Sequence, residues 1–167
     1  MTAAEAVQDF DRAREAFEVA LRRAPDAALR FRPQAEEYAL GGLVVHVTDV
    51  LRRYTALLDM LRAEQWQPLV APSLPTSDRD QQRIRDGFPG EERARVLDDM
   101  RASHAALADA ARATADDFER QAQVTFENAA QPYPTSAADV VGWVRDHYAE
   151  HTQQVSDLVT AWAASTR

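Results

Sequence analysis

The sequence predicts an all-α fold, a four-helix bundle in which a long crossover joins the second and third helices. Residues that favour helices dominate the composition, and only five of the 167 residues are glycine. Apolar residues recur at helical spacing in four long segments, and the eight prolines lie mainly between those segments. With 46% hydrophobic and 28% charged residues, residues 1–167 have the composition of a single globular domain.

The four helices are expected at residues 2–24, 39–64, 91–122 and from 136 onward. Pro25 ends the first helix, while Ser136, with Asp139 three residues later, begins the last as a capping box. Residues 65–90 form an unusually long connection, which contains a short helix that Ser77 begins. A connection of this length can run back along a neighbouring helix, so the second and third helices are expected to be parallel. No strand alternation is visible.

Charge and composition exclude several classes of partner. The net charge of −8 argues against a nucleic-acid backbone or an anionic membrane surface. No apolar run approaches the ~20 residues that cross a bilayer. The absence of cysteine excludes disulfides, thiolate metal sites and cysteine catalysis. The N-terminal segment has neither an apolar signal core nor an arginine-rich transit character, so we expect the protein in the cytoplasm.

The positions of the histidines predict a metal site. His147 and His151 are one turn apart on the apolar stripe of the last helix, about 40° from each other around its axis. Such an i, i+4 pair can chelate one ion, and His46 lies beside the apolar face of the second helix. The sequence therefore predicts a divalent metal ion held by His46, His147 and His151, with further positions open to water or substrate. Trp143 and Tyr148 are expected to pack beside this site.

Three further residues have two interpretations each. HYAEH also matches the inverted zinc-protease motif, with Glu150 as the general base. Such peptidases need an acidic ligand well downstream, whereas only 16 residues follow His151, so a carboxylate at the rim of the site is the preferred interpretation of Glu150. His104 either lines the metal cavity or is a structural residue. Asp49 either orients an imidazole or lies at the surface.

The segments around these histidines resemble the DinB/YfiT-like metalloenzymes over nearly the whole chain. LGGLVVHVTDVLRRY (residues 40–54) is similar to the second-helix motif of that family, and ALRRAPDAALRFRP (residues 20–33) to its opening helix and proline-flanked loop. DHYAEHTQQV (residues 146–155) is similar to its His-x-x-x-His-x-x-Gln-apolar signature, which includes Gln154 and Val155. Tyr38 and Ala39 stand where the family carries Trp-Ser, and the CPGW-like element of mycothiol-dependent relatives is absent.

The resemblance implies a four-helix bundle, a homodimer and the metal ligands His46, His147 and His151. It also implies a metal-dependent enzyme acting on a small molecule, either a hydrolase or an S-transferase that uses a low-molecular-weight thiol. The ion would be Zn, Ni or Fe, and imidazole ligands also suit Cu. Two alternatives stay open: a non-catalytic metal-binding or stress-related interaction protein, and a metal-free helical interaction protein. Because only neutral imidazoles bind metal, release is expected below about pH 6.

Overall fold

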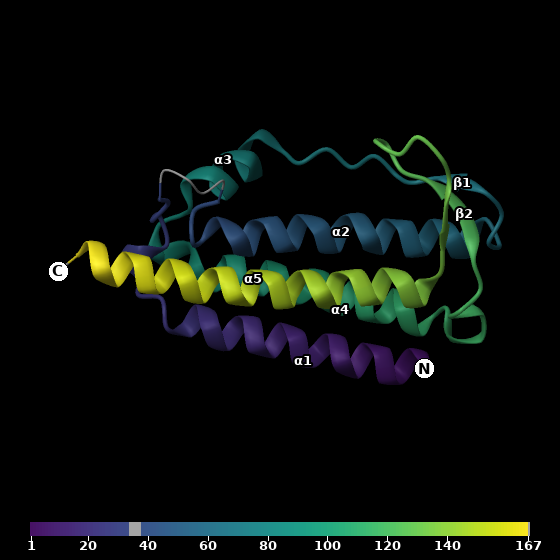
Figure 1. Cartoon of the computed structure of the whole chain (residues 1–167), viewed down its shortest axis with the longest axis horizontal. Coiled ribbons are helices and arrows are strands. Elements are labelled where there is room, and N and C mark those ends of the chain that lie inside the picture. Colours follow the sequence, from purple (N-terminus) through teal and green to yellow (C-terminus); the bar gives the residue numbers. More distant parts are fainter. Residues whose placement is uncertain (34–37, 167) are drawn as a thin grey trace.

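The computed structural model of the chain describes residues 1–33 and 38–166, most of which are helical. The long helices are α1 (Ala3–Arg22), α2 (Gly42–Ala63), α4 (Arg93–Arg112) and α5 (Ala137–Ser165). Figure 1 shows them side by side, with α1 and α5 running in one direction and α2 and α4 in the other. The main contacts join α1 to α5 and α2 to α4, and α2 also contacts α5. The two helices that carry the three histidines of interest are therefore neighbours.

The connection between α2 and α4 runs back along the molecule, as the sequence predicted (Figure 1). It contains α3 (Asp78–Asp86), which packs on α2. Ser77 begins this short helix, because its hydroxyl accepts a hydrogen bond from the backbone N–H of Asp80 at 3.1 Å. Helices α2 and α4 run in the same direction, as the sequence predicted (Figure 1). Three single 3₁₀ turns lie in the connections, at Asp26–Ala28, Gly90–Glu92 and Ala115–Asp117.

A small three-stranded sheet lies at one end of the helices, and its absence from the sequence prediction was an error. The strands are β1 (Leu69–Val70), β2 (Ala122–Thr125) and β3 (Tyr133–Thr135). The central strand, β2, is parallel to β1 and antiparallel to β3. Strands of two to four residues are too short to show an alternating pattern in the sequence.

The third long helix is shorter than predicted, ending at Arg112 and not at Ala122. The Thr114 hydroxyl donates to the carbonyl of Ala111 at 2.7 Å, which satisfies one of the acceptors at the helix end. The chain then turns and enters β2, where Val124 is fully buried. Tertiary pairing with β1 and β3 thus overrides a local sequence that contains no helix-breaking residue.

The start of α5 is determined by a local cap, whereas the first residue of α2 packs closely on α3. The capping box of α5 is present, since the Ser136 hydroxyl accepts from the backbone N–H of Asp139 at 3.1 Å and the Asp139 carboxylate accepts from the backbone N–H of Ser136 at 2.9 Å. Helix α2 begins at Gly42, three residues later than predicted. A Cβ at Gly42 would lie 2.0 Å from the carbonyl oxygen of Ile84 in α3, so only glycine allows this close approach.

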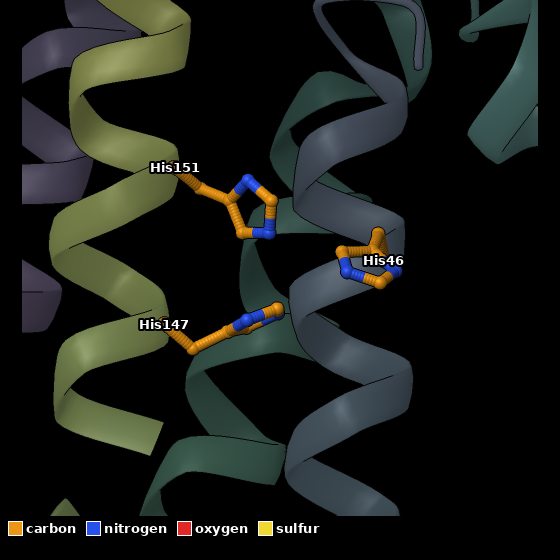
Figure 2. Close-up of side chains that lie close together, drawn as sticks. All are labelled: His46, His147 and His151. Carbon is orange, nitrogen blue, oxygen red and sulfur yellow. The ribbon is translucent and has the colours of Figure 1, made fainter. Parts of the chain in front are cut away.

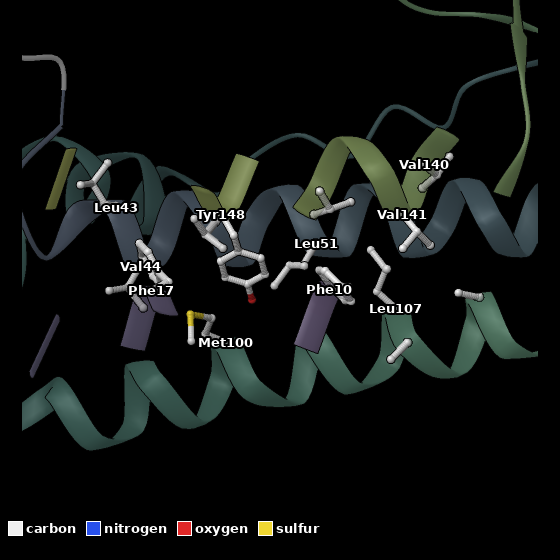
Figure 3. Close-up of a cluster of buried hydrophobic side chains, with 14 of the residues drawn as sticks. Phe10, Phe17, Leu43, Val44, Leu51, Met100, Leu107, Val140, Val141 and Tyr148 are labelled. Carbon is white, nitrogen blue, oxygen red and sulfur yellow. The ribbon is translucent and has the colours of Figure 1, made fainter. Parts of the chain in front are cut away.

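One cluster of buried side chains fills the space between the long helices (Figure 3). The rings of Phe10 and Phe17 on α1 lie 5.7 and 5.6 Å from that of Tyr148 on α5. Met100 and Leu107 of α4 are completely buried in the same cluster. Tyr148 is therefore a core residue. Among the described residues, no helix combines the length and the apolar character needed to cross a membrane.

Candidate metal centre

The three histidines predicted as ligands lie together, between two neighbouring helices. His147 and His151 project from adjacent turns of α5 toward α2, where His46 faces them (Figure 2). One ring nitrogen from each residue can be chosen such that all three atoms lie within 4.8 Å of one another. The ring centroid of His46 is 5.0 Å from those of both partners, and the two rings of α5 are 4.3 Å apart. The three side chains are positioned to hold one ion.

Unsatisfied ring nitrogens show that the donor set fits a metal. The Nε2 atoms of His147 and His151 are buried and have no hydrogen-bond partner among the described residues. A buried polar atom without a partner costs about 1–3 kcal/mol. A divalent ion bound by both lone pairs would remove that cost, and imidazole is a common ligand of such ions.

Burial keeps the imidazoles in the state that binds metal. Desolvation, followed by the nearby His147, His151 and Arg53, lowers the pKa of His46 from 6.5 to about 3. Desolvation and His151 lower the pKa of His147 from 6.5 to about 4, against a smaller opposite effect of Glu150. Both rings are therefore neutral near pH 7, and a neutral ring offers a lone pair to an ion.

Gln154 fixes the orientation of His151. The Nδ1–H of His151 donates to the Oε1 atom of Gln154 at 2.8 Å. This hydrogen bond selects the tautomer whose Nε2 lone pair is free, the usual role of a second partner behind a metal-binding histidine. From the sequence, Gln154 was identified only as part of a family signature.

Tyr38 is part of the site, although the sequence analysis gave it no role. Its ring stacks on His46 with the centroids 4.7 Å apart, and it meets the ring of His151 edge-on at 6.0 Å. A large aromatic residue of this kind limits the rotation of both imidazoles. The sequence offered one indication of this role: Tyr38 lies just before the second helix, where the resembled family carries Trp-Ser.

His104 lies in the core, away from the three-histidine cluster, so its interpretation as a cavity residue was wrong. Its ring stacks on Phe10 at 3.9 Å, and its Nε2–H donates to the Asp11 carboxylate at 2.7 Å. The hydroxyl of Tyr148 approaches Nδ1 at 3.4 Å. Both nitrogens have partners, which makes His104 a structural residue.

Asp49 is not a partner of the imidazoles. Its carboxylate accepts from the hydroxyl of Thr76 at 2.7 Å and pairs with the guanidinium of Arg53 at 2.7 Å. This network ties α2 to the crossover connection. With only 15% of its side chain exposed, Asp49 is neither a partner of the imidazoles nor a free surface residue.

Glu150 is exposed and lies at the rim of the site. No described carboxylate belongs to the group that could hold an ion. The inverted zinc-protease interpretation needs an acidic ligand in that group, so the described structure gives it no support.

Two open pockets meet at His147. The first, here called the polar pocket, has a volume of about 720 Å³ and is lined by the three histidines together with Tyr38, Glu150, Gln153, Gln154 and Asp157, among others. The second, here called the aromatic pocket, has a volume of about 660 Å³ and is lined by His147 with Val50, Arg53, Tyr54, Phe126 and Trp143, among others. Trp143, expected to pack beside the site, is a wall of this second pocket. Both volumes suit a small molecule.

Comparison with known families agrees with this arrangement. The family model of the DinB superfamily matches residues 9–155, a range that includes all three histidines. No curated protein is similar enough in sequence to count as a match. Because the family model covers most of the chain, this protein belongs to the DinB superfamily.

Proposed function

We propose that the protein is a metal-dependent enzyme acting on a small molecule, with His46, His147 and His151 as the ligands of one divalent ion. The observation that carries the proposal is the pair of buried, unpartnered Nε2 atoms within a group of three imidazoles from two helices. The neutral state of His46 and His147 near pH 7 supports it further.

The protein's own residues define what happens at such a centre. The three imidazoles leave at least one position open, Gln154 holds His151 in the ligating tautomer, and Tyr38 restricts His46. A bound divalent ion supplies Lewis acidity, which activates a water molecule for hydrolysis or a low-molecular-weight thiol for transfer to a substrate. We keep both reactions, with Zn, Ni or Fe as the ion.

The alternative is a non-catalytic metal-binding or stress-related interaction protein, in which the ion is structural. The two pockets beside the histidines favour the enzyme, because structural sites are normally closed by four protein ligands. A metal-free interaction protein agrees less well with the unpartnered nitrogens.

The visible absorption of bound Co²⁺ reports whether the ion has an open coordination position, which separates the enzyme from the structural alternative. Protein purified without a histidine tag is stripped of metal and loaded with Co²⁺, and its visible absorption is recorded while azide is added. We expect azide to change the spectrum, because an open position accepts the anion. A spectrum that azide leaves unchanged would favour the structural role. A panel of hydrolase substrates and thiol acceptors, with and without chelator, then separates the two reactions.

We also propose one four-helix-bundle domain, a cytoplasmic location and, on the family resemblance, a homodimer. The dimer is tested by sedimentation velocity, where we expect twice the mass of the chain. A monomer at micromolar concentration would contradict this part of the proposal.

A further inference from the structure

The aromatic pocket extends from the metal centre along the facing sides of α2 and α5. His147 lies at one end, and Trp143 is one turn earlier on α5. On α2 the lining residues run from Val50 to Leu57, a distance of about 10 Å at the rise of a helix. A molecule of two fused rings can therefore lie in the pocket with one end beside His147.

Three aromatic side chains line the pocket, and one of them contacts the other two. The ring of Trp143 lies 5.9 Å from that of Tyr54 on α2 and 6.0 Å from that of Phe126, which follows β2. Val50 and Leu57 add aliphatic surface. Surfaces of this kind favour a flat apolar ring, which stacks on aromatic faces and leaves water.

Two hydrogen-bond donors on these walls have no partner among the described residues. Neither the Tyr54 hydroxyl nor the Trp143 indole N–H takes part in a hydrogen bond, and burial raises the pKa of Tyr54, which keeps its proton in place. Arg53 lies on the same wall, where Asp49 and Thr76 hold its guanidinium at 2.7 and 2.6 Å. The pocket thus offers donors to a ligand that carries an acceptor.

The polar pocket has more acidic and fewer aromatic lining residues than the aromatic pocket, which contains the single carboxylate of Glu127 beside its three aromatic rings. The polar pocket contains the carboxylates of Glu150 and Asp157 and the amide of Gln153, and all of these side chains are exposed. Such a surface suits water and cations, and Tyr38 is its one aromatic side chain besides the histidines. The two sides of the candidate centre therefore differ in the chemistry that they favour.

We propose that the aromatic pocket binds the organic substrate, and that this substrate is a flat, mainly apolar ring compound with a hydrogen-bond acceptor. Its ring lies against Trp143 and Tyr54, and its reacting group lies beside His147. The word substrate rests on the proposed function, whereas the binding of the ring compound rests on the pocket alone.

The test uses 2-naphthoate, which has two fused rings and an acceptor group, and the full chain as purified. Binding is measured by ligand-observed NMR and by quenching of tryptophan fluorescence. We expect saturable binding with a dissociation constant of about 1 mM or tighter. Ala71 lines the aromatic pocket, so Ala71→Trp fills this pocket and should weaken binding at least about tenfold. Ala161 lines the polar pocket, so the matched substitution Ala161→Trp fills that pocket and should leave the dissociation constant within about twofold.

A second variant keeps the test decisive if Ala71→Trp does not fold. Tyr54→Phe removes one hydroxyl and keeps the ring, so we expect binding to weaken about fivefold. No saturable binding to the parent chain would overturn the proposal. The proposal would also be overturned if Ala161→Trp weakened binding as much as Ala71→Trp does. It would likewise be overturned if neither of the single variants Tyr54→Phe and Ala71→Trp weakened binding.

Metal content is measured on the same samples, and the titration is repeated in chelator. Binding of 2-naphthoate that persists in chelator supports the pocket, even in a chain that holds no metal, which would refute only the proposed function. Binding that disappears with the metal would mean that the carboxylate binds the ion alone, and this would refute the pocket. The two failures are therefore distinguishable.

Discussion

At the scale of single residues, the unpartnered nitrogens of His147 and His151 differ from the other buried polar groups. His104 is as buried as His151, with 4% of each residue exposed, yet both ring nitrogens of His104 have partners. The buried hydroxyls of Thr48 and Thr114 donate to backbone carbonyls at 2.7 Å. Only the two Nε2 atoms are left without partners among buried side-chain atoms of the described residues. The other buried polar side chains of the described residues have partners, which supports the proposal that this position is a ligand site.

The hydrogen bond from His151 to Gln154 predicts an effect on metal affinity. We expect Gln154→Ala to weaken binding about tenfold while the stoichiometry stays unchanged, because the second partner of a metal-binding histidine contributes a factor of this size. Competition with a chromophoric chelator measures the dissociation constant of the metal for each variant. Gln153→Ala is the matched control, since Gln153 is exposed and bonds only to Asp157 at 2.9 Å. Equal affinities of the two variants would refute the role of Gln154.

Stability of the metal-free protein should depend on pH through His46 and His147. Their pKa values in the folded chain, about 3 and about 4, lie below the value of 6.5 for a free imidazole. The unfolded chain therefore binds more protons below pH 6.5, so stability is complete above that pH and falls as the pH drops toward 4. Urea unfolding between pH 7 and 4 measures this loss.

The substitution His46→Ala is the control for this pH dependence and should reduce it, leaving the contribution of His147; an unchanged slope would contradict the assignment. The same lowered pKa values alter the expectation of metal release below about pH 6. That expectation used ordinary imidazoles, and we now expect retention to lower pH, because protons compete more weakly for buried rings.

At the scale of elements, two glycines in helices predict opposite effects of the same substitution. A Cβ at Gly142, inside α5, would meet nothing within 4 Å. Gly142→Ala should therefore stabilise the protein by about 0.5–1 kcal/mol. A Cβ at Gly42, the first residue of α2, would meet the Ile84 carbonyl at 2.0 Å. We expect Gly42→Ala to destabilise, because the contact between α2 and α3 must open.

Chemical denaturation of both glycine variants measures these changes in unfolding free energy. A stabilising effect of Gly42→Ala would mean that α2 and α3 do not pack as described. Although Gly142 is next to Trp143, a Cβ there would contact nothing. We therefore expect the dissociation constant of 2-naphthoate for Gly142→Ala to stay within about twofold of the parent value.

The elements that could be predicted from sequence are those whose signals are local. Helical periodicity and the capping box at Ser136 located α5, and Ser77 located α3. The end of α4 at Arg112 and the strand at Ala122–Thr125 could not be predicted in this way. Their cause is the pairing of β2 with β1, 55 residues earlier along the chain, and such pairing leaves no periodic pattern in so short a strand.

At the scale of the whole molecule, the crossover determines how the site is built. It returns the chain along the molecule, so that α2 and α4 run in the same direction (Figure 1). Helix α2, which contacts both α4 and α5, presents His46 to α5 (Figure 2). The i, i+4 spacing predicted that His147 and His151 act together. That His46 joins them depends on helix packing, and the sequence alone supplied that third ligand only through the family resemblance and its place near an apolar face.

A bound ion should stabilise the whole fold, because it joins α2 to α5. Free metal at 100 times its dissociation constant adds about 2.7 kcal/mol, which for a chain of this size raises Tm by about 5–10 °C. Differential scanning calorimetry with and without chelator measures the shift. The matched control is His46→Ala, in which the link to α2 is lost, so a much smaller shift is expected. An equal shift in both proteins would contradict a site shared by the two helices.

The most direct measurement of the central claim is the metal content of the double variant His147→Ala/His151→Ala. Untagged protein is incubated with Zn²⁺, freed of excess ion, and analysed for metal per chain by elemental analysis and native mass spectrometry. The parent chain and the control His104→Gln should each retain one ion per chain, whereas the double variant should retain none. One tightly held ion in the double variant would contradict the account.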